Sequence, residues 1–377
     1  MTKRYGTDEP MSWIVRVDYP TRHTERVTNL PPNPKRLFAS DNTAGAHPLV
    51  LEALSRANAG HVLAYGQDEL TRQAEARFNE LFDADVRTQF VYGGTGANVM
   101  ALAAMLKPAE AVVCSAWAHI AVDETGAPER LLGAKLIGLP SPDGKIRPDQ
   151  LRALSAVIGN QHHVQPGVLS ITQPTELGVL YSVDAIRVLC AAAHGMDMLV
   201  HMDCARVANA TAALGATSAA LRSFTIGAGV DVLSFGGTKA GAVFGEAVVF
   251  LNPALGQRAR FIRKQVTQLH SKMRFISAQY NALLTDNLFI DLGIRANAAA
   301  QRLYDATHHI DSLGLVRPPD ANSLFPTISD PIKTQLQEWS FFWDWDESKH
   351  QVRWMTAWDI EPSDVDDFAA GVKTLID

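Results

Sequence analysis

Short, nearly continuous apolar runs alternate with helical stretches along most of the chain. Seven of these runs are candidate strands: Gln89–Tyr92, Val112–Cys114, Lys135–Leu139, Val168–Thr172, Met198–Met202, Val232–Ser234 and Glu246–Phe250. A strand that is covered on both faces has such an uninterrupted run of Val, Ile and Leu. The pattern therefore predicts an α/β fold in which a mainly parallel seven-stranded sheet lies between helices.

The stretches between these runs have the spacing and end signals of helices. In Gln67–Phe82, apolar residues recur on one helical face, at Leu70, Ala74, Phe78 and Leu81. Ser182 can cap a helix over Val183–His194, and Gly195 can end it. This alternation of strand and helix is typical of an α/β domain.

The two ends of the chain have different patterns. Residues 1–33 are polar and contain proline, and we interpret them as an extended arm. Beyond a long helix predicted over Asn281–Ile310, the expected strands are Asn322–Pro326, Glu338–Trp343 and Val352–Trp358, and Ser363 can cap a final helix to about Ile376. The predicted organisation is the arm, a large α/β domain over residues 34–281 and a small α+β domain over residues 282–377.

Composition narrows the class of protein. The chain has 377 residues, of which 47% are hydrophobic and 20% charged, so it can bury a large core. A net charge of −6 gives no overall attraction for nucleic acid or anionic membrane. Three cysteines without CxxC spacing argue against a disulfide scaffold or a zinc site. With neither an apolar signal region nor a membrane-length run, the expected location is the cytoplasm.

A glycine-rich turn after one predicted strand carries a lysine. Val232–Ser234 leads into Phe-Gly-Gly-Thr and then Lys239. Ligands of open α/β sheets gather at the carboxyl ends of strands, and desolvation lowers the pKa of a lysine and frees its amine for Schiff-base chemistry. Taken alone, a turn lysine that points to water is the simpler interpretation.

Another predicted strand ends in an acid that is followed by an arginine. Asp203 comes directly after Met198–Met202, and Arg206 lies three residues further on. A carboxylate in this position can pair with a cationic ring nitrogen, and a guanidinium can bind a carboxylate with two parallel hydrogen bonds. A local Asp203–Arg206 ion pair, or a helix cap at Asp203, is the common alternative.

Two more strand ends carry weaker signals. Gly94 and Thr95 stand in a glycine-rich turn that opens a predicted helix to Leu106, and the N–H groups of such a turn can bind phosphate. His119 follows Val112–Cys114 and can stack on a flat ring or move a proton. An ordinary tight turn and a structural histidine are the alternatives.

The residues at the four strand ends are more informative together than singly. A phosphate site, a stacking histidine, an acid for a pyridinium nitrogen and a lysine for an imine are the groups that pyridoxal 5′-phosphate (PLP) requires. They occur in the order phosphate turn, His119, Asp203, Lys239. The set therefore predicts a PLP site.

Longer motifs around these residues resemble a known family. They are Phe38–Asn42 (FASDN), Tyr65–Asp68 (YGQD), Gly94–Asn98 (GTGAN), Ala118–His119 with Glu124–Pro128 (ETGAP), Thr175–Gly178 (TELG), His201–Arg206 (HMDCAR), Ser234–Lys239 (SFGGTK), Ser271–Arg274 (SKMR) and Val352–Arg353. In order and spacing the chain resembles the low-specificity L-threonine aldolases. These enzymes have the aspartate-aminotransferase-like fold type I and are related to the β-eliminating lyases.

The resemblance implies a role for each matching residue. Lys239 would form the imine with PLP, Asp203 would keep the pyridine nitrogen protonated, and His119 would stack on the ring. Gly94 and Thr95 would donate to the phosphate, and Arg274 would reach a phosphate across a subunit interface. Ser40, Arg206 and Arg353 would bind the substrate carboxylate, and Arg206 would also belong to the cofactor site. Glu176 or His119 would be the base for the β-hydroxyl.

The activity implied by the resemblance is reversible cleavage of an L-β-hydroxy-α-amino acid to glycine and an aldehyde, by a homodimer or homotetramer. Substrates of the L-threonine, L-allo-threonine or phenylserine type are expected. The alternatives are PLP-dependent β-elimination, transfer of a glycine unit to another aldehyde, and a PLP-fold protein that binds without turnover.

Overall fold

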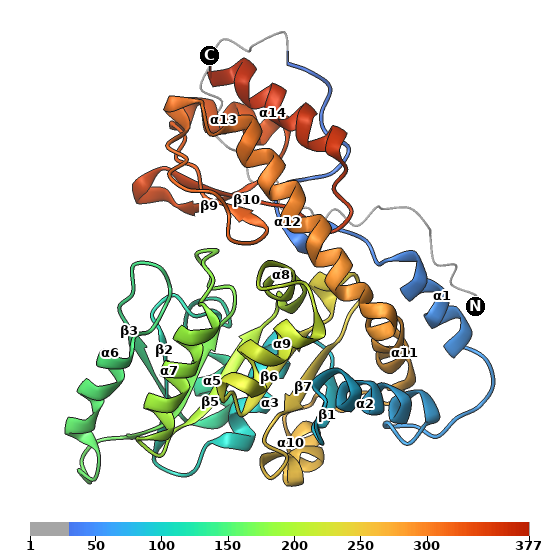
Figure 1. Ribbon diagram of the computed structural model, residues 1–377, viewed down its shortest axis with the longest axis vertical. Helices are drawn as coiled ribbons and strands as arrows, with labels where there is room; N and C mark the ends of the chain where they lie inside the picture. The colour runs from blue at the N-terminus through green and yellow to red at the C-terminus, as the bar shows by residue number, and fades with distance from the viewer. Residues whose placement is uncertain (1–29, 377) are drawn as a thin grey trace, which may run out of the picture.

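A seven-stranded sheet with helices on both faces forms the centre of the molecule (Figure 1). The structure, a computed structural model, describes residues 30–376. In sheet order the strands are β1 (Arg87–Val91), β7 (Glu246–Phe250), β6 (Val232–Gly236), β5 (Leu199–Cys204), β4 (Gln165–Thr172), β2 (Glu110–Ser115) and β3 (Lys135–Leu139). Only β7 is antiparallel to its neighbours, β1 and β6. The predicted fold class is confirmed.

The continuous apolar runs are explained by burial on both faces of this sheet. Along β6, Val232 packs into the core on one face, whereas Leu233 and Phe235 pack into the core on the other. All three side chains are inaccessible to solvent. Each of the seven predicted strands overlaps an observed one, although β4 begins earlier, at Gln165.

Most of the helices flank this sheet. They are α1 (Pro48–Ala57), α2 (Glu69–Phe82), α3 (Gly94–Met105), α4 (His119–Val122), α5 (Ala127–Leu132), α6 (Pro148–Ala153), α7 (Val183–His194), α8 (Val207–Ala213), α9 (Ser218–Phe224), α10 (Ala259–Gln265) and α11 (Arg274–Leu284). The predicted cap of α7 is confirmed, because the Ser182 side chain accepts from the N–H of Ala185 at 3.2 Å. Helix α2 begins two residues later than predicted, since Asp68 caps it.

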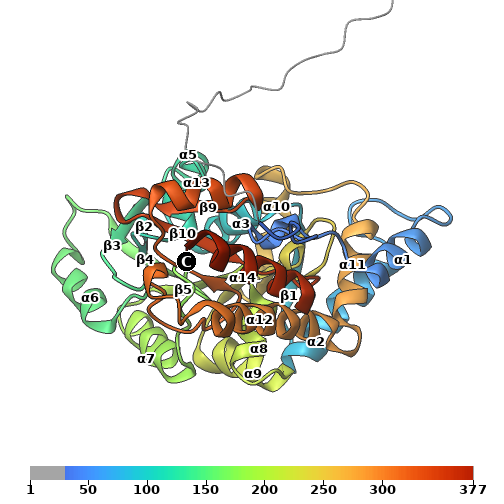
Figure 2. The same cartoon turned by 90° about the horizontal axis from the view of Figure 1, so that it is seen from above.

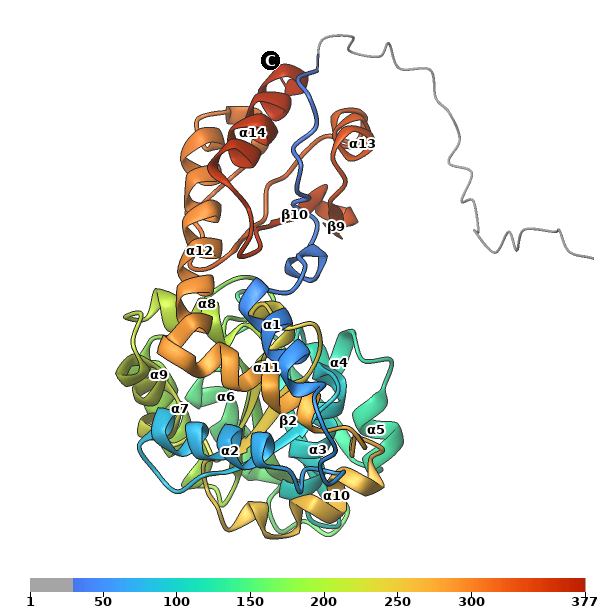
Figure 3. The same cartoon turned by 90° about the vertical axis from the view of Figure 1, so that its right-hand side faces the viewer.

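A smaller unit lies beside the carboxyl edge of the large sheet. It contains a three-stranded sheet in the order β8 (Ser323–Leu324), β10 (Gln351–Met355), β9 (Trp343–Asp346), with helices α13 (Asp330–Trp339) and α14 (Pro362–Ile376). Helix α12 (Leu288–Thr307) connects the two units and lies beside α14 (Figures 2 and 3). Its first half packs in the large core through Phe289 and Leu292, and its second half packs in the small core through Ala300 and Leu303.

Three predictions for the C-terminal part are wrong in detail. The helix predicted over Asn281–Ile310 is broken between α11 and α12, because Asp286 and Asn287 adopt positive φ angles of 51° and 58°. Asn and Asp tolerate this left-handed conformation better than other side chains. The strand predicted over Glu338–Trp343 is instead the end of α13 and a turn into β9.

The third error concerns the start of the last helix. Helix α14 begins at Pro362, so Ser363 lies inside it. The Asp364 carboxylate accepts the N–H of Glu361 at 3.0 Å and thereby takes the capping role. Pro at the first helical position needs no hydrogen-bond partner for its nitrogen.

The first described segment packs against the small unit. Phe38 is fully buried there and stacks on Phe368 at 4.3 Å between ring centroids. The carbonyl of Phe38 accepts the N–H of Met355 at 2.8 Å. Residues 1–29 of the predicted arm lie outside the described residues, and the domain limits after residues 33 and 281 stay predictions. Within the described chain, no helix is both long and apolar enough to cross a membrane.

Candidate active site

The carboxyl ends of the parallel strands bring the predicted lysine and acid together. The register places Asp203, at the end of β5, beside Ser234 of β6. Lys239 follows β6 in a single 3₁₀ turn, η4 (Thr238–Ala240). Burial lowers the pKa of Lys239, and the Arg206 guanidinium lowers it further, against the pull of nearby carboxylates that include Asp203. The amine is therefore less basic than that of an ordinary lysine, as its sequence context predicts.

Asp203 is held by hydrogen bonds from two sides. It is 6% exposed, and its Oδ1 accepts the N–H of Ala205 at 3.0 Å. Its Oδ2 accepts Nδ2 of Asn98 at 2.8 Å. The local Asp203–Arg206 ion pair is not formed, because Arg206 binds another carboxylate. Asp203 is thus a fixed acceptor at the sheet edge.

The N-terminus of α3 has the features of an anion site. Gly93 occupies the N-cap and has no side chain to accept the first N–H groups, so those of Gly94 and Thr95 are left for a ligand. A Cβ built on Gly93 or Gly94 would meet no atom within 4 Å. This space can receive a phosphate.

His119 is the first residue of α4 and is anchored through one ring nitrogen. Its Nδ1 lies 2.9 Å from Oε1 of Glu124. The hydrogen bond to Glu124 raises the pKa of His119, although burial opposes the increase. The side chain remains 42% exposed. The imidazole is therefore fixed on one side and accessible on the other.

Glu176 lies next to His119 and has one free oxygen. Its Oε1 accepts the backbone N–H of His119 and the hydroxyl of Thr172, both at 2.8 Å. Its Oε2 is buried and has no hydrogen-bond partner in the described chain. Burial raises the pKa of Glu176 to about 7. The alternative of an ion pair with Lys or Arg is not seen among residues 30–376.

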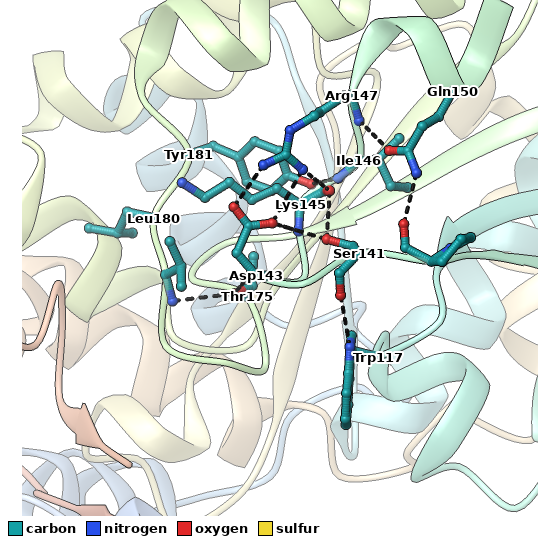
Figure 4. A network of polar contacts seen from close by, with 12 residues as sticks. Trp117, Ser141, Asp143, Lys145, Ile146, Arg147, Gln150, Thr175, Leu180 and Tyr181 are labelled. Atoms are coloured by element: carbon teal, nitrogen blue, oxygen red, sulfur yellow. Dashed lines mark hydrogen bonds and ion pairs between the residues drawn. The ribbon is translucent and has the colours of Figure 1, made fainter. Parts of the chain in front are cut away.

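The turn that carries Glu176 is braced by the loop after β3 (Figure 4). Thr175 donates its hydroxyl to the carbonyl of Asp143 at 2.9 Å. Asp143 in turn binds Arg147 at 3.0 Å, and Trp117 donates its indole N–H to the carbonyl of Ser141 at 2.9 Å. Because Thr175 directly precedes Glu176, its bond to this braced loop helps to hold the turn in place.

Arg206 is already bound to a carboxylate of this chain. Its Nε and Nη2 lie 2.6 and 3.2 Å from the two oxygens of Asp41, which is 3% exposed. Although burial opposes ionisation, Arg206 and Lys239 hold the pKa of Asp41 below its usual value. Ser40 precedes Asp41 and accepts the N–H of Asn42 at 3.2 Å. Ser40 and Arg206 therefore lie close together, because Asp41 follows Ser40 in the chain and binds Arg206.

Arg353 differs from Arg206 in having no carboxylate partner among residues 30–376. It lies on β10 with its guanidinium carbon 5.2 Å from the centre of the Trp345 ring. Its Nε is buried and lacks a hydrogen-bond partner in the described residues. Burial and the charge of Arg206 lower the pKa of Arg353 to about 10. A buried guanidinium with an unpartnered Nε favours the binding of a carboxylate that a bound molecule supplies.

Arg274 is not joined to the other candidates within one subunit. It begins α11, and its Nη1 lies 3.2 Å from the carbonyl oxygen of Gly60. The predicted contact with a neighbour's phosphate stays a prediction.

Four buried residues of the site were not predicted: Asp41, Asn98, Glu124 and Glu246. Asn98 lies one helical turn after Gly94, a spacing that places both on the same side of α3. Glu246 faces η4 and accepts the N–H of Gly237 at 2.7 Å, and burial raises the pKa of Glu246 to about 7. Asp41, Asn98 and Glu124 all belong to motifs that the sequence made visible.

The sheet, together with a lysine, an acid and a helix N-terminus at its carboxyl edge, defines a PLP enzyme of fold type I. A solved threonine aldolase from Leishmania major has this fold, with a TM-score of 0.83 and 30% identity over 90% of this chain and 99% of that one. The chain belongs to the β-eliminating lyase family, whose model matches residues 38–331.

Two bacterial relatives are more similar in sequence. The low-specificity L-threonine aldolase of a Pseudomonas species is 38% identical, and that of Pseudomonas aeruginosa is 36% identical. Each alignment covers 90% of this chain and 97% of the relative. These matches confirm the predicted resemblance and the prediction of a PLP-dependent lyase.

Proposed function

We propose that this chain binds PLP through Lys239 and reversibly cleaves an L-β-hydroxy-α-amino acid to glycine and an aldehyde. Substrates of the L-threonine, L-allo-threonine or phenylserine type are proposed because both bacterial relatives are named for L-threonine. The observation that carries the proposal is the placement of Lys239, Asp203 and His119 at one sheet edge, next to the open N-terminus of α3.

The residues present fit the cofactor. Gly94 and Thr95 would bind the phosphate, His119 would stack on the ring and Asp203 would pair with the ring nitrogen. When bound, PLP supplies an electron sink for the pair left when the Cα–Cβ bond breaks. A carboxylate in this place would favour the protonated ring nitrogen, since opposite charges attract.

The chain's own groups would orient the substrate and move its protons. Arg353 would bind the α-carboxylate, with Ser40 and the free edge of Arg206 completing the clamp. Asp41 would hold Arg206 in place. Glu176 would take the β-hydroxyl proton on its unpartnered Oε2, with Nε2 of His119 as the competing acceptor. Fixing the carboxylate and the hydroxyl together orients the bond to be broken.

A panel of β-hydroxy amino acids with glycine release as the readout tests the proposal. Glycine plus aldehyde supports aldol cleavage. A keto acid plus ammonia would indicate β-elimination, and transfer of a glycine unit only to a second aldehyde would indicate a transaldolase. PLP binding without turnover of any substrate would indicate a binding protein.

We predict that Glu176→Gln lowers kcat for β-hydroxy substrates by about 10²–10⁴-fold, the usual contribution of a general base. Because the pKa of Glu176 is about 7, its basic form is lost as the pH falls through that value, so the wild-type rate should fall below about pH 7. Exchange of the glycine α-proton involves no hydroxyl and should persist. Equal losses in both reactions would point to structural damage, and no loss in either would assign the proton transfer to His119.

Arg353→Gln is expected to raise KM by about 10- to 100-fold, because a charge-assisted hydrogen bond contributes about 1.5–3 kcal/mol. Steady-state kinetics with a β-hydroxy amino acid measures this. The control is Arg302→Gln, which removes an exposed arginine paired with Asp366 on the same unit and should leave KM unchanged. An unchanged KM in Arg353→Gln would exclude Arg353 from the clamp.

We further propose that the enzyme is a cytoplasmic homodimer or homotetramer in which Arg274 reaches the phosphate site of a neighbouring subunit. Loop residues beside Arg274 support this, because Val62 and Leu63 are 50% and 67% exposed, as expected of a surface that a partner covers. Sedimentation at assay concentration should show at least a dimer. A fully active monomer would refute this assembly.

A further inference from the structure

A buried hydrogen-bonded chain joins His119 to Asp203. Oε1 of Glu124 lies 2.9 Å from Nδ1 of His119 and accepts Nδ2 of Asn98, also at 2.9 Å. The same Nδ2 donates to Oδ2 of Asp203 at 2.8 Å. The four residues come from α4, the turn before α5, α3 and β5, so the fold itself assembles the chain.

The hydrogen-bonding chemistry of the Asn98 amide indicates which ring nitrogen of His119 carries a proton. An amide nitrogen carries two hydrogens, and Asn98 directs both at carboxylate oxygens. The reverse orientation would place its carbonyl oxygen against two carboxylates. Oε1 of Glu124 is consequently an acceptor from Asn98, and it favours a proton on Nδ1 of His119. Nε2 is then the ring atom that gains or loses the proton when His119 titrates.

Because Glu124 is buried, its carboxylate depends on His119 for a compensating charge. The Glu124 side chain is inaccessible to solvent, and its Oε2 has no hydrogen-bond partner in the described chain. A buried carboxylate requires a compensating charge or donor, and the imidazole is the adjacent group that can become cationic. The other charged groups that face His119 are Asp203 on β5 and Lys239 in η4, which act in opposite directions on the pKa of His119. Glu176, at the end of β4, contacts only its backbone N–H.

We propose that Glu124 and Asn98 are positioning residues: Glu124 holds the proton on Nδ1 of His119, and Asn98 connects that pair to Asp203. This inference rests on the proposed function, in which His119 would stack on the cofactor ring and Asp203 would pair with the ring nitrogen. It explains why an uncharged amide lies between two carboxylates that would otherwise repel each other.

The test uses the protein without cofactor or substrate, labelled with ¹⁵N-histidine. Long-range ¹H–¹⁵N spectra report the tautomer and the pKa of His119, whose signals are assigned by their loss in His119→Asn. We expect a protonated Nδ1 and an unprotonated Nε2 above the pKa. In Glu124→Gln the pKa of His119 should fall by about one unit or more, the usual effect of losing an adjacent opposite charge.

Matched variants separate positioning from general damage. Glu129→Gln removes an exposed carboxylate from the next helix and should leave the pKa of His119 unchanged. Glu124→Asp keeps the charge on a shorter side chain, so its His119 pKa should lie between those of the wild type and Glu124→Gln. An Nε2–H tautomer in the wild type, or an unchanged pKa in both Glu124 variants, would overturn the inference. Absence of aldol activity with the expected tautomer would instead overturn only the proposed function.

Discussion

Lys239→Ala is expected to lower kcat by at least about 10⁴-fold, the upper end of what a positioned proton-transfer group contributes. The same amine would also hold the cofactor covalently, so the variant loses two functions at once. The variant should still bind PLP without a covalent bond, because the N-terminus of α3 and Asp203 are unchanged. Activity assays and the visible absorbance of the purified protein measure the two effects separately.

Borohydride reduction of the wild type should fix a pyridoxyl group on Lys239 alone. The control is Lys272→Ala, which removes an exposed lysine from another family motif and should leave the labelling intact. Recovery of the label on a different lysine, or on none, would show that the assignment of Lys239 is wrong.

Asp203→Asn is expected to reduce kcat by about 10²–10³-fold, which is typical for the loss of one preorganised electrostatic partner. The variant keeps an oxygen that can accept the N–H of Ala205, so the fold should survive. Its second atom, however, becomes a donor that faces Nδ2 of Asn98. This lost hydrogen bond should lower the unfolding temperature modestly, whereas the loss in kcat should be much larger.

The role of Asp203 is decided by comparing the kcat of Asp203→Asn with that of the wild type, both at saturating PLP. Near-normal turnover with the cofactor bound would mean that Asp203 does not stabilise a protonated ring nitrogen. A large drop in unfolding temperature with full activity per folded molecule would assign Asp203 a structural role.

The sheet and its reactive strand ends were predictable because each depends on local sequence. Buried parallel strands such as β6 have continuous apolar runs, and Lys239 and Asp203 follow such runs directly. Helix α7 was predicted from Ser182 and Gly195, since its caps are also local. What lies within one element or at its end can be identified from the chain alone.

The errors and omissions arise from contacts between distant segments. The pairing of Asp41 with Arg206 joins residues 165 positions apart, and nothing in either motif announces it. The substrate role of Arg206 stays a prediction, and the structure adds a contact that the motifs do not indicate, between Asp41 and the Nε and Nη2 atoms of Arg206. The break between α11 and α12 depends on two consecutive left-handed residues, which periodicity does not detect.

Helix α13 was mistaken for a strand for a related reason. Its buried residues Leu336 and Trp339 lie three apart, but the aromatic run that follows has the composition of a strand. The start signals of α13, Ser329 and Pro331, stand well before Glu338. The aromatic composition of Glu338–Trp343 therefore favours a strand where the structure has the end of a helix.

The packing of Phe38 on Phe368 has a consequence for synthesis of the protein on the ribosome. The large sheet is complete once β7 has emerged, but the partner of Phe38 belongs to the last helix of the chain. Asp41, three residues after Phe38, also takes a hydrogen bond from Asn322, which emerges late. Nascent chains should therefore form the large sheet first, while Asp41 takes its final place beside Arg206 only after Asn322 and helix α14 have been synthesised.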